Sequence, residues 1–210
     1  MSRKPIVPYE TRFLVSSPPR YELDAASEVW HCLHATGICE DAQVFFVRDR
    51  DRHLAGLIAI VFDGDPITAA RAIRGYLARK PWIMRYALRI IPTEIVCVEL
   101  SELENFVRST YADRIENDDT WMIRVSKHAS RMRSSEIIDR LARHVDRGKV
   151  SLEHPRWIIN VEVIRNTFLA AIIRPDDIIR KKEVWSKLRH AKLLEYVDPI
   201  ALRNLSKNYC

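Results

Sequence analysis

The first hundred residues alternate between hydrophobic patterns typical of strands and of helices. Helical stripes follow Asp24 and Asp65, both residues of a type that caps helix N-termini, and Gly37 is placed to end the first helix. Residues 86–98 read as one long strand, bent or interrupted at Pro92. Three further apolar runs have the length and residue types of strands: residues 12–17, 43–47 and 54–62. The resulting order is strand, helix, strand, strand, helix, strand, which is that of a ferredoxin-like domain.

The second half of the chain carries another mixture of strands and helices. Ser101 and Glu104 form a capping box that predicts a helix, and Pro175 begins a final helix. Between them, the pattern predicts a strand at 121–125, a helix with its apolar stripe at 137–145, and strands at 157–164 and 168–173. We therefore expect an α+β fold with a ferredoxin-like βαββαβ domain at 1–100, an α/β domain at 101–176, and a basic C-terminal helix and tail at 177–210.

Positive charge is concentrated in two parts of the sequence. The chain has 210 residues, with 34 Lys plus Arg against 28 Asp plus Glu, for a net charge of +6. Residues 121–149 carry a net +5 and residues 174–210 a net +4, so the remainder is slightly acidic. Basic charge that is concentrated in this way suggests a polyanionic partner, and a nucleic acid is favoured over a membrane. The alternative is that these residues are simply solvated at the surface, and charge alone does not exclude it.

The cysteines and the hydropathy pattern indicate a soluble protein of a reducing compartment. Cys32 and Cys97 fall in a predicted helix and a predicted strand, where they read as small core residues. Cys39 lies near His31 and His34, but the spacing fits no zinc pattern, and we expect no metal. No apolar run approaches the length of a membrane span. We therefore expect a cytoplasmic location.

No motif in the sequence argues for catalysis or a cofactor. The five glycines lie too far apart to cradle a dinucleotide or a triphosphate, and no serine lies between two nearby glycines. Neither HExxH nor the Pro-Cys-x-x-Cys of zinc deaminases occurs. The acidic pairs at 63–65 and 118–119 are typical of turns. We expect no catalytic residues and no cofactor.

A basic loop leads from the strand at 121–125 into the following helix. It contains Lys127, His128, Arg131 and Arg133 and no acidic residue. Ser134 or Ser135 can cap that helix, whose free backbone N–H groups would join the cations as donors to phosphate oxygens. An ordinary solvated loop is the alternative, and the spacing alone does not decide between them. Trp121 and Trp157 follow the core-facing alternation of their strands, which favours packing over base stacking.

The motifs in this half of the chain resemble the THUMP domain. They are residues 118–127 (DDTWMIRVSK), 134–138 (SSEII) and 150–157 (VSLEHPRW), while residues 89–94 (RIIPTE) resemble the ferredoxin-like domain that commonly precedes it. The whole is similar to stand-alone archaeal THUMP proteins, relatives of the adaptor that serves tRNA cytidine acetyltransferase. The sequence departs from the family at Ala129, where a glycine is usual, and alanine tolerates a left-handed conformation less well.

The resemblance implies a protein that binds tRNA, often at its acceptor end, and leaves the chemistry to another chain. The expected partners are tRNA and a separate modifying enzyme such as a cytidine acetyltransferase, making N4-acetylcytidine, with no membrane. The residues expected to contact RNA are Arg124, Lys127, His128, Arg131, Arg133, Ser134, Ser135, Arg147, Lys149 and Arg156, with the last three extending the patch.

Three other functions stay open at this point. One is tRNA binding for a different modification, such as methylation, thiolation or pseudouridylation, and another is an enzyme whose site has no recognisable motif. Alternatively, its basic C-terminal helix docks an acidic protein, with Trp185 and Leu188 either folding back on the body or facing another chain. Identification of the RNA and protein that accompany the chain in cells distinguishes an RNA-binding adaptor from a protein-interaction module.

Overall fold

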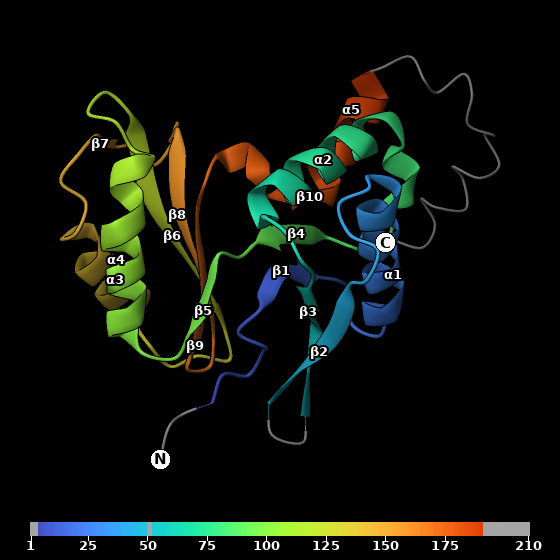
Figure 1. Cartoon of the computed structure of the whole chain (residues 1–210), viewed down its shortest axis with the longest axis horizontal. Helices are drawn as coiled ribbons and strands as arrows, with labels where there is room; N and C mark the ends of the chain where they lie inside the picture. Colours follow the sequence, from blue (N-terminus) through green and yellow to red (C-terminus); the bar gives the residue numbers. More distant parts are fainter. Residues whose placement is uncertain (1–3, 50–51, 191–210) are drawn as a thin grey trace.

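A computed structural model describes residues 4–49 and 52–190, in which two five-stranded sheets are each covered by helices on one face (Figure 1). The order of elements agrees with an α+β fold. The α-helices are α1 (Glu22–Ala35), α2 (Pro66–Arg79), α3 (Leu100–Thr110), α4 (Ser134–Ala142) and α5 (Lys181–His190). The strands are β1 (Thr11–Ser16), β2 (Gln43–Asp49), β3 (Arg52–Val61), β4 (Arg89–Pro92), β5 (Ile95–Cys97), β6 (Thr120–His128), β7 (Lys149–Val150), β8 (Trp157–Ile164), β9 (Thr167–Ile173) and β10 (Ile179–Arg180). Three 3-10 turns complete the order: η1 (Pro81–Ile83), η2 (Tyr111–Asp113) and η3 (Pro175–Asp177).

The first sheet, sheet A, has the ferredoxin-like arrangement that the sequence predicts. Its strand order is β10-β4-β1-β3-β2, and every pair is antiparallel. Helices α1 and α2 cover one face, where they bury Phe13, Val15, Ile58 and Ile60. The six elements of the βαββαβ order thus pack into one core because strand and helix periods each present a single apolar face.

The second sheet, sheet B, has the order β5-β9-β8-β6-β7. Strands β6, β7 and β8 run parallel, while β9 runs antiparallel to β8 and to β5. Helices α3 and α4 cover its outer face, where Leu103, Ile137 and Leu141 pack on β8 and β9. A parallel pair needs a long crossover, and the β6–α4–β8 segment provides it.

The two sheets pack against each other through their uncovered faces. Leu14 and Ile91 of sheet A pack with Leu169 and Ala171 of sheet B in a shared core. The molecule therefore has four layers, in the order α3 and α4, sheet B, sheet A, α1 and α2, read from left to right in Figure 1. Because both faces of each sheet are covered, most of the strand residues are buried.

The chain changes sheets earlier than the domain boundary predicted near residue 100, and it returns at the C-terminus. Residues 86–98 are not one strand: β4 ends at Pro92 in sheet A, and β5 begins at Ile95 in sheet B. The predicted final helix is also displaced, since Pro175 begins a single 3-10 turn and α5 begins only at Lys181. Trp185 folds back on the body, where its Nε1 donates a hydrogen bond to the Met84 carbonyl at 2.8 Å. The side chain of Leu188 lies outside the described residues.

Helix starts agree with the sequence in one case and differ in two. Asp65 caps α2 as expected, accepting a hydrogen bond from the Thr68 N–H at 2.6 Å. The capping box of α3 uses Glu99 and Glu102 in place of the predicted Ser101 and Glu104. Helix α1 begins at Glu22 without a side-chain cap, two residues before the predicted cap at position 24. Within the described ranges, no helix combines the length and hydrophobicity needed to cross a membrane.

Candidate nucleic-acid interface

The loop between β6 and α4 is closed by its own hydrogen bonds. Lys127 Nζ donates to the Met132 carbonyl at 3.0 Å, and Ser130 Oγ accepts from the Met132 N–H at 3.3 Å. Ala129 adopts a φ of +53°, the left-handed conformation for which glycine is better suited. These contacts shape the loop so that the side chains of Arg131 and Arg133 stay exposed.

The amino end of α4 carries no side-chain cap. Arg133 occupies the N-cap position in an extended conformation, and Ser134 is already the first helical residue. The expectation that Ser134 or Ser135 caps the helix is therefore wrong, because both side chains belong to the first helical turn. The N–H groups of that turn have no side-chain acceptor, which leaves them available to an anion.

Lys127, Arg131 and Arg133, which we call the loop cations, surround this helix start. All three are exposed, and among the residues that the structure describes none of them forms an ion pair with a carboxylate. A surface with unpaired cations and free backbone donors attracts phosphate through both charge and hydrogen bonding.

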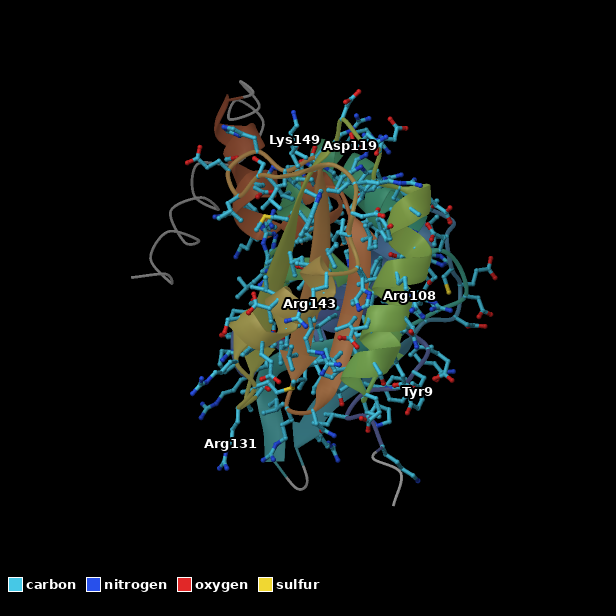
Figure 2. All side chains as sticks on the ribbon, turned by 90° about the vertical axis from the view of Figure 1, so that its left-hand side faces the viewer. Tyr9, Arg108, Asp119, Arg131, Arg143 and Lys149 are labelled. Carbon is cyan, nitrogen blue, oxygen red and sulfur yellow. The ribbon has the colours of Figure 1, made fainter. Side chains whose placement is uncertain are left out.

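The expected extension of this patch to Arg147, Lys149 and Arg156 is not found. Lys149 pairs with Thr120 at the start of β6, and the Arg156 N–H donates to the Thr120 carbonyl, so both lie at the amino end of that strand. The eight steps of β6 from Thr120 to His128, at roughly 3.3 Å each, separate them by about 26 Å from the loop that carries Arg131 and Arg133. Figure 2 shows the same separation, with Lys149 and Asp119 at one end of the molecule and Arg131 at the other.

Two of these three distant side chains have structural partners. Arg156 Nη1 lies 2.7 Å from Asp119 Oδ1, in an ion pair with a buried carboxylate. Burial alone would raise the pKa of Asp119, but a hydrogen bond from the Glu116 N–H, another from Trp157 Nε1 and the charge of Arg156 outweigh it, so the pKa is lowered. Arg147 Nη1 donates to the Ala112 carbonyl. These side chains stabilise the turn before β6. Trp121 is buried in the core of sheet B and Trp157 packs against it, as expected of residues that serve packing.

Arg124 lies on the same face of β6 as Met122, which packs against the core between the sheets, and it is influenced by the charges of two arginines that the sequence did not single out. Burial lowers the pKa of Arg124, and so do the nearby charges of Arg180 and Arg89. We call Arg89, Arg124 and Arg180 the seam arginines, because they come from β4, β6 and β10 along the junction of the two sheets. Arg180 pairs with Glu183 at 3.0 Å. Local spacing does not reveal this cluster, since its members are up to 91 positions apart in the sequence.

Glu162 is buried and links Arg89 of sheet A to His128 of sheet B. Its side chain is 1% exposed, and its carboxylate accepts from Arg89 Nη2 at 3.0 Å and from His128 Nε2 at 2.9 Å. Burial would raise the pKa of Glu162, but the hydrogen bond from His128 and the charges of Arg89 and His128 outweigh it and lower the pKa. A carboxylate only accepts, so Nε2 of His128 carries the proton. His128 is therefore a structural link between strands and is less available to RNA than the loop cations.

The structure thus divides the ten residues expected to bind RNA into three sets. One set lies on the loop and the start of α4, a second lies near the junction of the two sheets, and a third lies at the amino end of β6; they are, in that order, Lys127, Arg131, Arg133, Ser134 and Ser135; Arg124 and His128; and Arg147, Lys149 and Arg156.

Arg165, on the turn after β8, lies at the same end as the loop cations because its N–H donates to the His128 carbonyl at 3.0 Å. Along residues 4–49 and 52–190, no cluster of three His, Cys, Asp or Glu side chains is placed to hold a metal ion. The arrangement is suited to binding a polyanion, with donors on the loop, on the helix start and along the seam.

Comparison with protein families identifies the second domain. Residues 97–171 match the model of the THUMP domain. This match begins in β5 and ends in β9, so it takes in sheet B with α3 and α4. The chain therefore contains a THUMP domain, which occupies about a third of its length. No curated protein matches the sequence.

Several solved structures are similar to this chain over most of its length. PH1313 from Pyrococcus horikoshii Ot3 has a TM-score of 0.56 and 12% identity, covering 81% of this chain and 55% of that one. TrmN from Thermus thermophilus has a TM-score of 0.52 and 17% identity, covering 78% and 46%. A 4-thiouridine synthetase, solved as an RNA complex with bound ATP, has a TM-score of 0.48 and 12% identity, covering 81% and 42%. The first two likenesses show a common fold, and this chain spans about half the length of the structures it matches.

Proposed function

We propose that this chain is a non-catalytic tRNA-binding adaptor for a separate tRNA-modifying enzyme, and that the reaction it serves is N4-acetylcytidine formation. The THUMP match supports the tRNA-binding part of this proposal. The acetylation part comes from the resemblance of residues 118–127, 134–138 and 150–157 to stand-alone THUMP proteins. The acceptor region is the expected ligand, with its backbone phosphates on the loop cations.

The observation that carries the proposal is the pairing state of the loop cations. Lys127, Arg131 and Arg133 are exposed beside an uncapped helix start, and only Lys127 of the three donates a hydrogen bond, to the Met132 carbonyl, among the contacts of the described residues. At the other end of β6, Arg156 is paired with the buried carboxylate of Asp119, and Arg147 donates to the Ala112 carbonyl. Contacts to RNA phosphates release counterions, so the binding constant falls as the salt concentration rises. Each contact makes the slope of the logarithm of the binding constant against the logarithm of the salt concentration steeper by about 0.7 to 0.9. The interface therefore extends from the loop cations toward the seam arginines, and the amino end of β6 lies outside it.

Binding of purified tRNA by fluorescence anisotropy, between about 50 and 250 mM KCl, tests this interface. We expect the double variant Arg131→Ala/Arg133→Ala to weaken binding and to reduce the salt slope by about 1.4 to 1.8, the contribution of two contacts. These two side chains are chosen because Lys127 also closes the loop through Met132. The matched control, Arg147→Ala/Lys149→Ala, removes the same charge about 26 Å away along β6 and should leave the slope unchanged.

An unchanged dissociation constant for the first variant at fixed salt contradicts the interface. Nucleoside analysis of tRNA incubated with the chain and an acetyl donor, with and without a cytidine acetyltransferase, tests the adaptor role. We expect N4-acetylcytidine only when both proteins are present. Modification by this chain alone would show that it is an enzyme, and a different modified nucleoside with another partner would assign it to methylation, thiolation or pseudouridylation.

A further inference from the structure

Two buried polar atoms at the seam arginines have no hydrogen-bond partner within the described part of the chain. They are Asn160 Oδ1, which is an acceptor, and Arg89 Nε, which is a donor. The side chain of Asn160 is almost wholly enclosed, since the residue is 1% exposed. Buried polar groups of folded proteins are nearly always paired, so an exception indicates that a group from outside the chain completes the pairing. At the seam, that group has to offer both an acceptor and a donor.

The strand register places Asn160 beside Arg124, on the face of sheet B that meets sheet A. The two residues pair directly between β8 and β6. Asn160 is two residues from Ile158, which packs in the core shared by the sheets, and alternate residues of a strand share a face. Beyond Trp121, β6 is the outermost described strand of sheet B, because β7 pairs only with Thr120 and Trp121. Arg124 therefore lies at the border of the sheet, and Asn160 lies one strand further in.

Sheet A contributes Arg89 and Arg180 from the facing side. These two arginines pair in register between β4 and β10, and β10 is the edge strand of the sheet. Ile91, two residues along β4 from Arg89, packs in the shared core, so both arginines lie on the face that meets sheet B. Their charges act on Arg124. Three cations from two sheet edges thus lie near one another beside the buried amide.

The carboxylates of the seam neutralise only part of this positive charge. Glu162 and Glu183 each pair with one arginine of sheet A, at 3.0 Å. Arg124 has no carboxylate partner among the residues that the structure describes, and its Nη2 lies 4.0 Å from Met122 Sδ. The planar guanidinium of arginine presents several donors that match the oxygens of a phosphate. Arg124 therefore has donors available for an oxyanion.

We propose that the seam binds one phosphate group, which accepts hydrogen bonds from Arg124 and Arg89 and carries or adjoins a hydroxyl that donates to Asn160 Oδ1. The hydroxyl belongs to the ion itself in hydrogen phosphate and to the ribose in RNA. A ligand of this class satisfies the unpaired donor and the unpaired acceptor together. Where the phosphate belongs to RNA, the inference rests on the proposed function and adds a preference for RNA over DNA, which has no 2′-hydroxyl. Binding of the free ion is independent of that function.

Thermal unfolding of the full chain in sodium phosphate at about pH 7.5, from about 0.5 to 50 mM and with chloride added to constant ionic strength, tests the site. Phosphate at about ten times its dissociation constant should raise the melting temperature by roughly 3–6 °C over its value in chloride. Sulfate has no hydroxyl and leaves Asn160 Oδ1 unpaired, so it should bind about fivefold more weakly. Each shift is measured against the same protein in chloride, so a variant of lower stability remains informative.

Two substitutions and a control assign the shift to the seam. Arg124→Gln removes the cation that has no carboxylate partner and should weaken phosphate binding at least about tenfold. Asn160→Leu keeps the branched shape of the side chain without its polar atoms, so phosphate and sulfate should then bind within about twofold of each other. The control Lys149→Gln removes the same charge as Arg124→Gln, from an exposed side chain at the amino end of β6, and should keep the full phosphate shift.

Fluorescence anisotropy with single-stranded RNA and DNA of one sequence identifies the source of the phosphate. If it comes from RNA, then RNA binds more tightly than DNA, free phosphate competes with it, and Asn160→Leu removes the difference. A phosphate shift with equal affinities for RNA and DNA assigns the site to the free ion.

Three results overturn the inference: equal melting temperatures in phosphate and chloride, equal affinities of the wild type for phosphate and sulfate, or a phosphate shift that Arg124→Gln retains. None of them bears on the loop cations. Weaker tRNA binding by Arg131→Ala/Arg133→Ala would uphold the proposed function even if the seam binds no phosphate.

Discussion

Replacing Glu162 with glutamine isolates the charge that links the two domains. Glutamine has the shape of glutamate and an oxygen that accepts hydrogen bonds, so the variant removes the negative charge while it leaves no cavity. The carboxylate lies between Arg89 of β4 and His128 of β6, at 3.0 Å and 2.9 Å. Without it, Glu183 is the remaining acidic residue, within the part of the chain that the structure describes, whose charge acts on Arg124.

The magnitude follows from these two contacts. Glutamine keeps one oxygen for the Arg89 N–H, while its NH2 faces His128, whose Nε2 can accept once the ring proton moves to Nδ1. A hydrogen bond to a charged group contributes roughly 1.5–3 kcal/mol and a neutral one about 1 kcal/mol, so each of the two contacts loses about 1 kcal/mol. Arg89 is 31% exposed, and solvent screening reduces its share. We expect a total loss of about 1.5 kcal/mol in the free energy of unfolding, or roughly 3–6 °C in melting temperature for a chain of this size.

Urea denaturation at several pH values provides the assay. The folded state lowers the pKa of Glu162 below its ordinary value of 4.5, so its contribution is complete above pH 4.5 and is lost as the pH falls through the lower folded pKa. The stability gap between wild type and Glu162→Gln should therefore be full at pH 7 and shrink at pH 3.5. The matched control is Glu183→Gln, an exposed partner of Arg180, which should change stability by less than about 0.5 kcal/mol. Equal stability of Glu162→Gln and wild type at pH 7, or a gap that does not shrink in acid, would refute this reasoning.

Three further substitutions test the backbone of the two domains, each measured by urea denaturation. Ala129→Gly relieves the left-handed φ of +53° and should stabilise the protein by about 0.5–1 kcal/mol; a loss would show that the loop is not strained. Gly148→Ala should destabilise it by about 2 kcal/mol or more, since φ is +72° and the new Cβ would lie 2.7 Å from the Asp119 carbonyl oxygen; a neutral result would place the loop differently. Glu28→Ala removes the acceptor for three consecutive backbone N–H groups, at residues 85–87, and should cost about 2 kcal/mol, whereas Glu28→Gln should retain part of it.

The sequence by itself determined the elements, because strand and helix periods depend only on neighbouring residues. The alternation at residues 121–125 marked β6, and the apolar runs at 157–164 and 168–173 marked β8 and β9 with their observed bounds nearly unchanged. The order of strands and helices in the first hundred residues likewise predicted the ferredoxin-like arrangement of sheet A, and the motifs of the second half predicted the THUMP domain. The left-handed conformation expected to strain Ala129 is present, since loop geometry is local too.

Only the tertiary structure decided which basic residues lie together. Arg156 is close to Arg133 in the sequence, yet α4 and the following loop carry the chain back along the length of β6, so the two lie at opposite ends of the sheet. Conversely, Arg89 and Arg180 join Arg124 although long segments separate them. The physical reason is that the spacing of residues in one segment encodes which face is buried, whereas the neighbours across that face come from packing between remote strands, where two sheets cover each other.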